Sequence, residues 1–178
     1  MTALSVLKFN TPEGADQALG TLQGMQKQQL IQVVDAAVVK WPKGAEAPKT
    51  KQSFSTTGAG ALTGTFWGML FGLIFFMPFF GAAIGAAMGA ITGAMSDYGI
   101  DDDFIKNSRD KVTEGTSALF LLSTNAVLDK VIAGLKDLHP ELISSNLSAE
   151  QEAKLRAAFG DDETPETAPE TAEGKATA

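Results

Sequence analysis

An uncharged stretch from residue 52 to residue 96 constrains this chain more than any other feature. It contains no Lys, Arg, Asp or Glu, and eight of its nine glycines form two ladders with a spacing of four residues. The ladders are Gly60, Gly64, Gly68 and Gly72, and Gly81, Gly85, Gly89 and Gly93. A run of roughly 18 or more apolar residues is typical of a membrane helix, and a proline ends or kinks a helix. The stretch therefore predicts a transmembrane helical hairpin that turns at Met77 and Pro78.

The spacing of the glycines indicates how the two arms of this hairpin pack. Four residues advance about 400° around a helix with about 3.6 residues per turn, so each ladder lies on one face. Small residues on such a face let two helix backbones approach closely, as in the GxxxG motif. We therefore predict a glycine zipper in which the glycines of both ladders are helix-packing residues. A Gly/Ala-rich helix pair in a soluble oligomer is the competing interpretation.

Charged residues beside the hairpin indicate its orientation. Lys and Arg lie close to both ends of the hairpin, whereas its tip has none: Lys40, Lys43, Lys49, Lys51, Lys106, Arg109 and Lys111. By the positive-inside rule, this predicts that the folded domain is cytoplasmic. Each arm is slightly short for a hydrocarbon core of about 30 Å, so a re-entrant hairpin stays open as an alternative. The predicted partners are the lipid bilayer and further copies of the chain.

The segments on either side of the hairpin repeat one pattern. Each segment contains an apolar strand, a helix with an apolar stripe and a second apolar strand. The predicted strands are at 4–9, 30–40, 117–123 and 141–147, and the helical stripes run over 15–25 and 128–138, the latter capped by Asn125. Two βαβ halves, residues 4–40 and 117–147, predict a ferredoxin-like α+β sandwich that the hairpin interrupts.

This pattern divides the chain into four parts. Residues 1–51 hold the first βαβ half with a short strand at 49–54, and residues 52–96 form the hairpin. Residues 97–160 hold a connecting helix at 101–111, the second βαβ half and a C-terminal helix that begins at a capping box on Ser148. Residues 161–178 contain proline in the repeated tripeptide Pro-Glu-Thr, which predicts a disordered acidic tail.

The chemistry of the side chains argues against an enzyme. The chain has no cysteine, which excludes thiolate catalysis and cysteine metal sites, and its net charge of −7 argues against nucleic acid as a partner. The single histidine, His139, precedes a proline and is expected in a turn. Asp97 and residues 101–103 lack the spacing of an EF-hand loop and fit a helix N-terminus. We therefore predict no catalytic, cofactor-binding or metal-ligating residue and no cofactor.

Two short motifs carry a resemblance to a known family. The stretch Ser-Asp-Tyr-Gly-Ile-Asp-Asp-Asp-Phe-Ile at 96–105 and the stretch Ser-Ala-Leu-Phe at 117–120 follow the glycine ladders. With them, residues 4–160 resemble an uncharacterised bacterial membrane-protein family, the domain of unknown function twelve sixty-nine. The resemblance implies a membrane-associated bacterial protein, here at the inner membrane, and it implies no activity.

Three functions from different classes are compatible with these features. The leading prediction is a non-enzymatic, membrane-associated scaffold that oligomerises through glycine-zipper hairpins and presents a cytoplasmic α+β domain. A pore or permeability factor is the first alternative, although ion pathways usually carry polar or ionisable residues and the hairpin has no charged one. A membrane-tethered, ligand-sensing module built on the ferredoxin-like domain is the second alternative.

Overall fold

The computed structural model describes residues 2–55, 64–76, 95–96 and 98–160 of the 178-residue chain. Its strands are β1 (Ala3–Phe9), β2 (Gln32–Lys40), β3 (Lys49–Ser55), β4 (Ser117–Thr124) and β5 (Glu141–Ser145). Its helices are α1 (Gly14–Lys27), α2 (Gly64–Phe71), the π-helical η1 (Gly72–Phe76), α5 (Asp102–Lys111), α6 (Leu128–Leu135), the 3-10 helix η2 (Lys136–Leu138) and α7 (Ala149–Phe159). The protein therefore belongs to the mixed α+β class, as predicted.

One antiparallel sheet of five strands, in the order β3-β2-β4-β1-β5, forms the centre of the described chain. Strand β4 lies in the middle, where Phe120 pairs with Val6 of β1 on one side and with Ala37 of β2 on the other. Strand β1 also pairs with β5. The sheet therefore interleaves strands from before and after the predicted hairpin.

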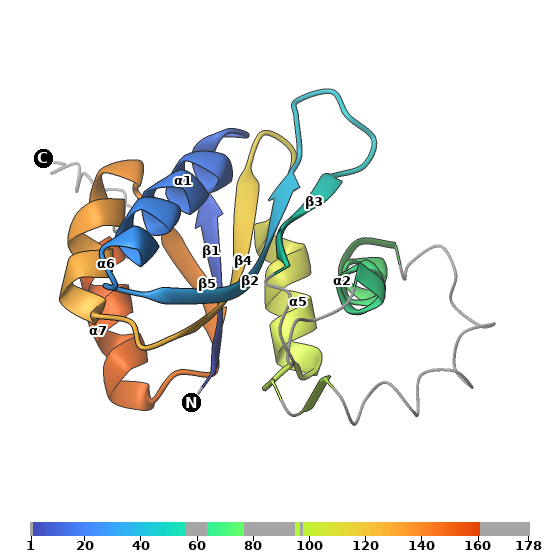
Figure 1. The fold of residues 1–178 in the computed structure, drawn as a ribbon. Helices are drawn as coiled ribbons and strands as arrows, with labels where there is room; N and C mark the ends of the chain where they lie inside the picture. The colour runs from blue at the N-terminus through green and yellow to red at the C-terminus, as the bar shows by residue number, and fades with distance from the viewer. Residues whose placement is uncertain (1, 56–63, 77–94, 97, 161–178) are drawn as a thin grey trace, which may run out of the picture.

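Helices α1, α6 and α7 cover one face of this sheet (Figure 1). The apolar stripe of α1 packs into a buried cluster with β4, because residues three and four apart lie on the same face of a helix. Leu22 of α1 and Leu135 of α6 are fully buried in this cluster, and Leu155 of α7 is nearly so. Burial of one such side chain contributes roughly 1.5–3 kcal/mol to the free energy of folding.

The opposite face of the sheet is covered by α2, η1 and α5, as Figure 1 shows. The ring of Phe71 in α2 meets the ring of Phe120 in β4 edge to face, with centroids 5.0 Å apart. Trp67 and Ile74 are buried in the same cluster. Strands β2 and β4 are thus covered on both faces, which explains why their sequences are continuously apolar rather than alternating.

The first arm of the predicted hairpin is therefore part of the folded domain where the structure describes it. Residues 64–76 form two short consecutive helices whose apolar side chains pack against the sheet. Within the described residues, no helix has the length and apolar character needed to cross a membrane. The prediction of a transmembrane helix is wrong for this part of the chain, because the sheet covers the apolar side chains that the prediction placed in lipid. The turn at Met77 and Pro78 and the second arm lie outside the described residues.

Local hydrogen bonds explain where the helices begin. The hydroxyl of Ser117, the first residue of β4, accepts a hydrogen bond from the N–H of Ala15 in the first turn of α1 (3.0 Å). At α7 the predicted cap is confirmed, since the Ser148 hydroxyl accepts a bond from the N–H of Gln151 (3.4 Å). The prediction that Asn125 caps α6 is wrong. It adopts a left-handed conformation with φ of 52°, and α6 begins after Val127.

Candidate functional site

Helices α2 and η1, residues 64–76, form an insertion segment with two different faces. The inward face is buried against the sheet and consists of Trp67, Leu70, Phe71 and Ile74. The outward face consists of Gly64, Gly68, Gly72 and Phe76, and we refer to these four residues as the glycine face. Gly64 and Gly68 are exposed, Gly72 is half-buried, and Phe76 is 37% exposed. The segment therefore presents to solvent a stripe without charged side chains.

Asp35 on β2 anchors the insertion segment to the sheet near its beginning. Its carboxylate is fully buried, and one oxygen accepts hydrogen bonds from the indole N–H of Trp67 (2.8 Å) and from the side chain of Gln52 (3.0 Å). The other oxygen accepts a bond from the backbone N–H of Ala36 (2.8 Å). A buried carboxylate is tolerated only where donors replace its lost hydration. These three donors do so, and one of them belongs to the insertion segment.

Arg109 on α5 holds the other end of the segment. Its guanidinium donates from Nε to the carbonyl oxygen of Ile74 and from Nη2 to that of Leu73, both at 2.8 Å. The last carbonyls of a helix lack partners within the helix, and a cation at that end is favourable. In the sequence, Arg109 was one of the cations used to predict the orientation of the hairpin in a membrane. In the structure, its two hydrogen bonds hold η1 in place.

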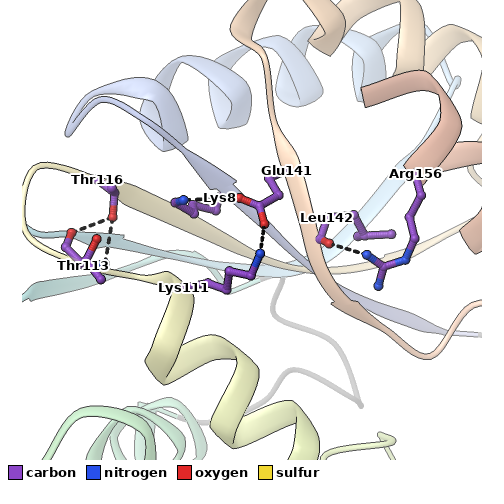
Figure 2. Close-up of polar contacts among 7 residues, drawn as sticks. All are labelled: Lys8, Lys111, Thr113, Thr116, Glu141, Leu142 and Arg156. Carbon is purple, nitrogen blue, oxygen red and sulfur yellow. Dashed lines mark hydrogen bonds and ion pairs between the residues drawn. The ribbon is translucent and has the colours of Figure 1, made fainter. Parts of the chain in front are cut away.

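A carboxylate between two lysines fixes α5 in turn. Glu141 of the edge strand β5 binds Lys111, the last residue of α5, at 2.5 Å and Lys8 of β1 at 3.2 Å. Figure 2 shows the two ammonium groups on either side of the carboxylate. Burial raises the pKa of Glu141, but the hydrogen bonds and charges of Lys111 and Lys8 outweigh burial and hold that pKa below its ordinary value. The two ion pairs therefore attach α5, the helix whose Arg109 holds η1, to the sheet.

Further polar contacts lie in the turn that follows α5 and between α7 and β5. The turn from α5 to β4 is held by the Thr116 hydroxyl, which donates to the carbonyl of Thr113 (2.6 Å) and accepts from its N–H (3.0 Å). Arg156 of α7 donates to the carbonyl of Leu142 on β5 (2.9 Å) and pairs with Glu152 (Figure 2 shows the first contact). These contacts hold the turn that follows α5 and attach α7 to β5.

The structure describes only three of the predicted helix-packing residues. Gly64 and Gly68 lie in α2, and Gly72 begins η1. A Cβ atom built on Gly68 or Gly72 meets no atom within 4 Å, and one built on Gly64 reaches only the side chain of Gln52 at 3.6 Å. No close helix contact is therefore formed at these positions within the described chain. The remaining predicted residues lie outside it: Gly60, Met77, Pro78, Gly81, Gly85, Gly89 and Gly93.

The acidic residues after the hairpin have a structural role at α5. The Asp101 side chain accepts a hydrogen bond from the N–H of Phe104 (2.8 Å) and so caps the helix. In the ranges that the structure describes, no group of three or more His, Asp or Glu residues is arranged to hold a metal ion. His139 lies exposed in a turn with a left-handed φ of 48°.

Sequence reasoning missed Asp35 and the donor role of Trp67. A signal was present, because Asp35 interrupts the otherwise apolar run from Val33 to Val39. An acid within a strand that is buried on both faces requires donors from a neighbouring element. The uncharged stretch supplies two of these donors, at Gln52 and at Trp67.

Comparison with known families places the chain. No curated protein and no solved structure matches it significantly. The family model described as a protein of unknown function, DUF1269, matches residues 61–160, more than half of the 178-residue chain. The match runs from the insertion segment through α5 and the second βαβ half to the end of α7. The chain therefore belongs to the DUF1269 family of proteins of unknown function.

Proposed function

We propose that this protein is a non-enzymatic scaffold that forms homo-oligomers through its glycine face. The observation that carries the proposal is the exposure of this face, with Gly64 and Gly68 exposed and Phe76 at 37%. An exposed apolar stripe on a rigidly held element is typical of a protein contact surface. The bonds of Trp67 and Arg109 hold the segment so that the glycine face points away from the sheet.

The presence of glycine at positions 68 and 72 supports a close contact with a helix outside the described chain. Each glycine inside a helix costs about 1 kcal/mol relative to alanine. At Gly68 and Gly72 a Cβ atom would meet no neighbour within 4 Å, so packing in the described chain does not require glycine there. A second helix that approaches closely would require it, because the distance between packed helix axes depends on the side chains at the contact. A second copy of the same segment supplies such a helix.

The fold supports a scaffold role in a second way. We infer that the strands β2, β4, β1 and β5 form a ferredoxin-like core, because their order and the βαβ connections through α1 and α6 follow that pattern. Strand β3 extends this core at one edge, and the insertion segment with α5 covers its second face. The single exposed histidine and the lack of cysteine in the sequence support a non-enzymatic role.

The mass of the full-length protein in solution tests this proposal. We expect the wild-type protein to form a defined oligomer by light scattering, and Gly68→Leu to reduce its mass to that of one chain. Leucine is a better helix former than glycine, so the far-UV circular dichroism of the variant should not fall. The matched control is Gly20→Leu on α1, which makes the same change at another exposed, uncrowded helix position and should keep the oligomer.

Two results would contradict the proposal. The first is a wild-type protein with the mass of one chain at all concentrations, which would mean that the glycine face packs against another part of its own chain. The second is an unchanged oligomer in Gly68→Leu, which would place the contact elsewhere.

A further inference from the structure

A cavity of about 420 Å³ lies between the sheet and helices α6 and α7, on the face opposite the insertion segment. It opens at the end of the sheet where β1 begins and where β4 and β5 end. Cavities of roughly 300–1,000 Å³ are the ones in which proteins bind small molecules. This cavity shares no residue with the glycine face, so it bears on a second function beyond the scaffold.

The cavity exists because side chains on the helix-covered face become small toward this end of the sheet. Along β1 and β4, this face carries Leu7 and Leu121 in the middle of the strands. Toward the end it carries Ser5 on β1 and Ser123 on β4, and Ser123 pairs across the ladder with Ala3. Small residues facing one another under α6 and α7 leave space that large side chains fill elsewhere on this face.

Ser123 supplies a polar group inside this space. Its side chain lines the cavity, the residue is only 6% exposed, and its hydroxyl has no hydrogen-bond partner in the part of the chain that the structure describes. Because this hydroxyl faces the cavity, it can exchange a hydrogen bond to water for one to a ligand. The neighbouring Ser5 differs, because its hydroxyl shares a hydrogen bond of 3.3 Å with that of Ser145. Ser123 is therefore available to donate to a ligand.

The beginning of α6 adds backbone donors at the same place. Leu128, the first residue of α6, lines the cavity, and the N-cap residue Val127 makes no side-chain hydrogen bond to the helix. The N–H of Lys130 already donates to the carbonyl of Val127 (2.9 Å), so the donors at the start of α6 are the N–H groups of Leu128 and Asp129, which favour an oxygen acceptor. Together with Ser123, the start of α6 selects a ligand that carries an acceptor oxygen.

The remaining lining defines the rest of the ligand. None of the described residues that line the cavity is Lys, Arg, His, Asp or Glu. Leu155 and Phe159 of α7 and Val131 of α6 line its apolar side. A charged ligand would lose hydration here without gaining a counter-charge. We propose that this cavity binds an uncharged amphipathic small molecule, with a carbonyl or hydroxyl oxygen at Ser123 and the start of α6 and an apolar body against α7.

Three probes of equal chain length test the class of ligand. We expect full-length protein to bind octanamide saturably, at one site per chain, in isothermal titration calorimetry at neutral pH. Octanoate and octylammonium should bind at least about ten-fold more weakly, because their charges find no partner in the cavity. If octanoate or octylammonium binds as tightly as octanamide, or if octanamide does not bind saturably, the proposal is overturned.

Two variants test the place of binding. Ser123→Leu fills the floor of the cavity and should abolish octanamide binding, whereas Ser123→Ala should leave the fold intact and weaken binding about five-fold through loss of one hydrogen bond. The control is Ser144→Leu on β5. Ser144 pairs with Val6 and is not among the residues that line the cavity, so this variant should bind octanamide as the wild type does. Unchanged binding in both Ser123 variants would show that the probe binds elsewhere and would overturn the assignment, whether or not Ser123→Leu is fully stable.

Discussion

The indole N–H of Trp67 donates a hydrogen bond of 2.8 Å to the carboxylate of Asp35, and both side chains are buried. Trp67 belongs to α2 and Asp35 to β2, so this bond joins the insertion segment to the central part of the sheet. A hydrogen bond to a carboxylate in a water-excluded core is directional and strong, whereas apolar contacts fix position only loosely. Asp35 therefore determines the orientation in which α2 lies on the sheet.

Removal of the indole N–H should destabilise the protein. We expect Trp67→Phe to lower the free energy of unfolding by about 2 kcal/mol, because it leaves a buried carboxylate with one donor fewer. Trp41→Phe is the matched control, since Trp41 is half-buried and its indole donates at 2.8 Å to a neutral carbonyl, that of Ala45. Its loss should be about 1 kcal/mol or less. Equal losses in urea unfolding would contradict the role assigned to Asp35.

Replacement of Arg109 should loosen the insertion segment locally. Lysine cannot make the two bonds that the guanidinium makes to Leu73 and Ile74. We expect Arg109→Lys to speed amide hydrogen exchange about ten-fold over residues 64–76, with little change in β4. Arg156→Lys removes a similar guanidinium contact at β5 and should leave exchange in the insertion segment unchanged. A uniform rise in exchange over the whole domain would argue against a local clamp.

Acid should weaken the attachment of α5 through Glu141. Because its pKa is held below the ordinary value in the folded state, this carboxyl stabilises the fold at pH values above the ordinary pKa. That contribution is lost as the pH falls through the folded-state pKa. We expect Glu141→Gln to lower the free energy of unfolding by about 1 kcal/mol at neutral pH and to flatten its pH dependence between about pH 6 and pH 3. Glu150→Gln, at an exposed site in α7, is the control and should leave the profile as it is. If the stability of Glu141→Gln depended on pH as that of the wild type does, Glu141 would not contribute to this pH dependence.

Two glycines of α1 should respond in opposite directions to alanine. A Cβ atom on the buried Gly14 would lie 2.4 Å from the Cβ atom of Phe9, so we expect Gly14→Ala to destabilise the protein by about 2 kcal/mol. A Cβ atom on Gly20 meets nothing within 4 Å, so Gly20→Ala should stabilise it by up to about 1 kcal/mol. Thermal unfolding of both variants measures the difference. Stabilisation by Gly14→Ala would show that β1 and α1 do not approach each other as described.

Most strands and helices could be predicted from the sequence because local pattern and tertiary environment agree there. The strand predicted at 4–9 is Ala3–Phe9, and the one predicted at 141–147 is Glu141–Ser145. The cap of α6 could not be predicted in the same way. Asn125 has the side chain of a typical cap, but it turns toward Gln32 of β2, at 3.5 Å, and α6 begins later. That choice depends on a contact between residues far apart in the sequence.

The error in predicting a transmembrane helix over residues 64–76 has a clear physical origin. Hydropathy measures how strongly a segment avoids water, and it does not distinguish lipid from the apolar face of a sheet. The strand predicted at 30–40 is too continuously apolar to have one face in water, and the strand at 117–123 is predicted to be buried, so both require cover on two faces. The uncharged stretch was long enough to provide that cover through Trp67, Phe71 and Ile74. The contacts of Asp35 and Arg109 with the insertion segment could not be predicted, because these residues meet the segment only in the folded chain.

The interleaved order of the strands also determines when the sheet can form during synthesis on the ribosome. Strand β4 is the shared partner of β1 and β2, yet it is synthesised after both of them and after the insertion segment. A nascent chain that ends before Ser117 can pair only β2 with β3, and the aromatic side chains of α2 and η1 then have no complete sheet to cover. Late closure of long-range strand pairs prolongs the exposure of apolar surface. Synthesis of residues 77–124 is therefore the interval in which chaperone binding and aggregation compete with co-translational folding.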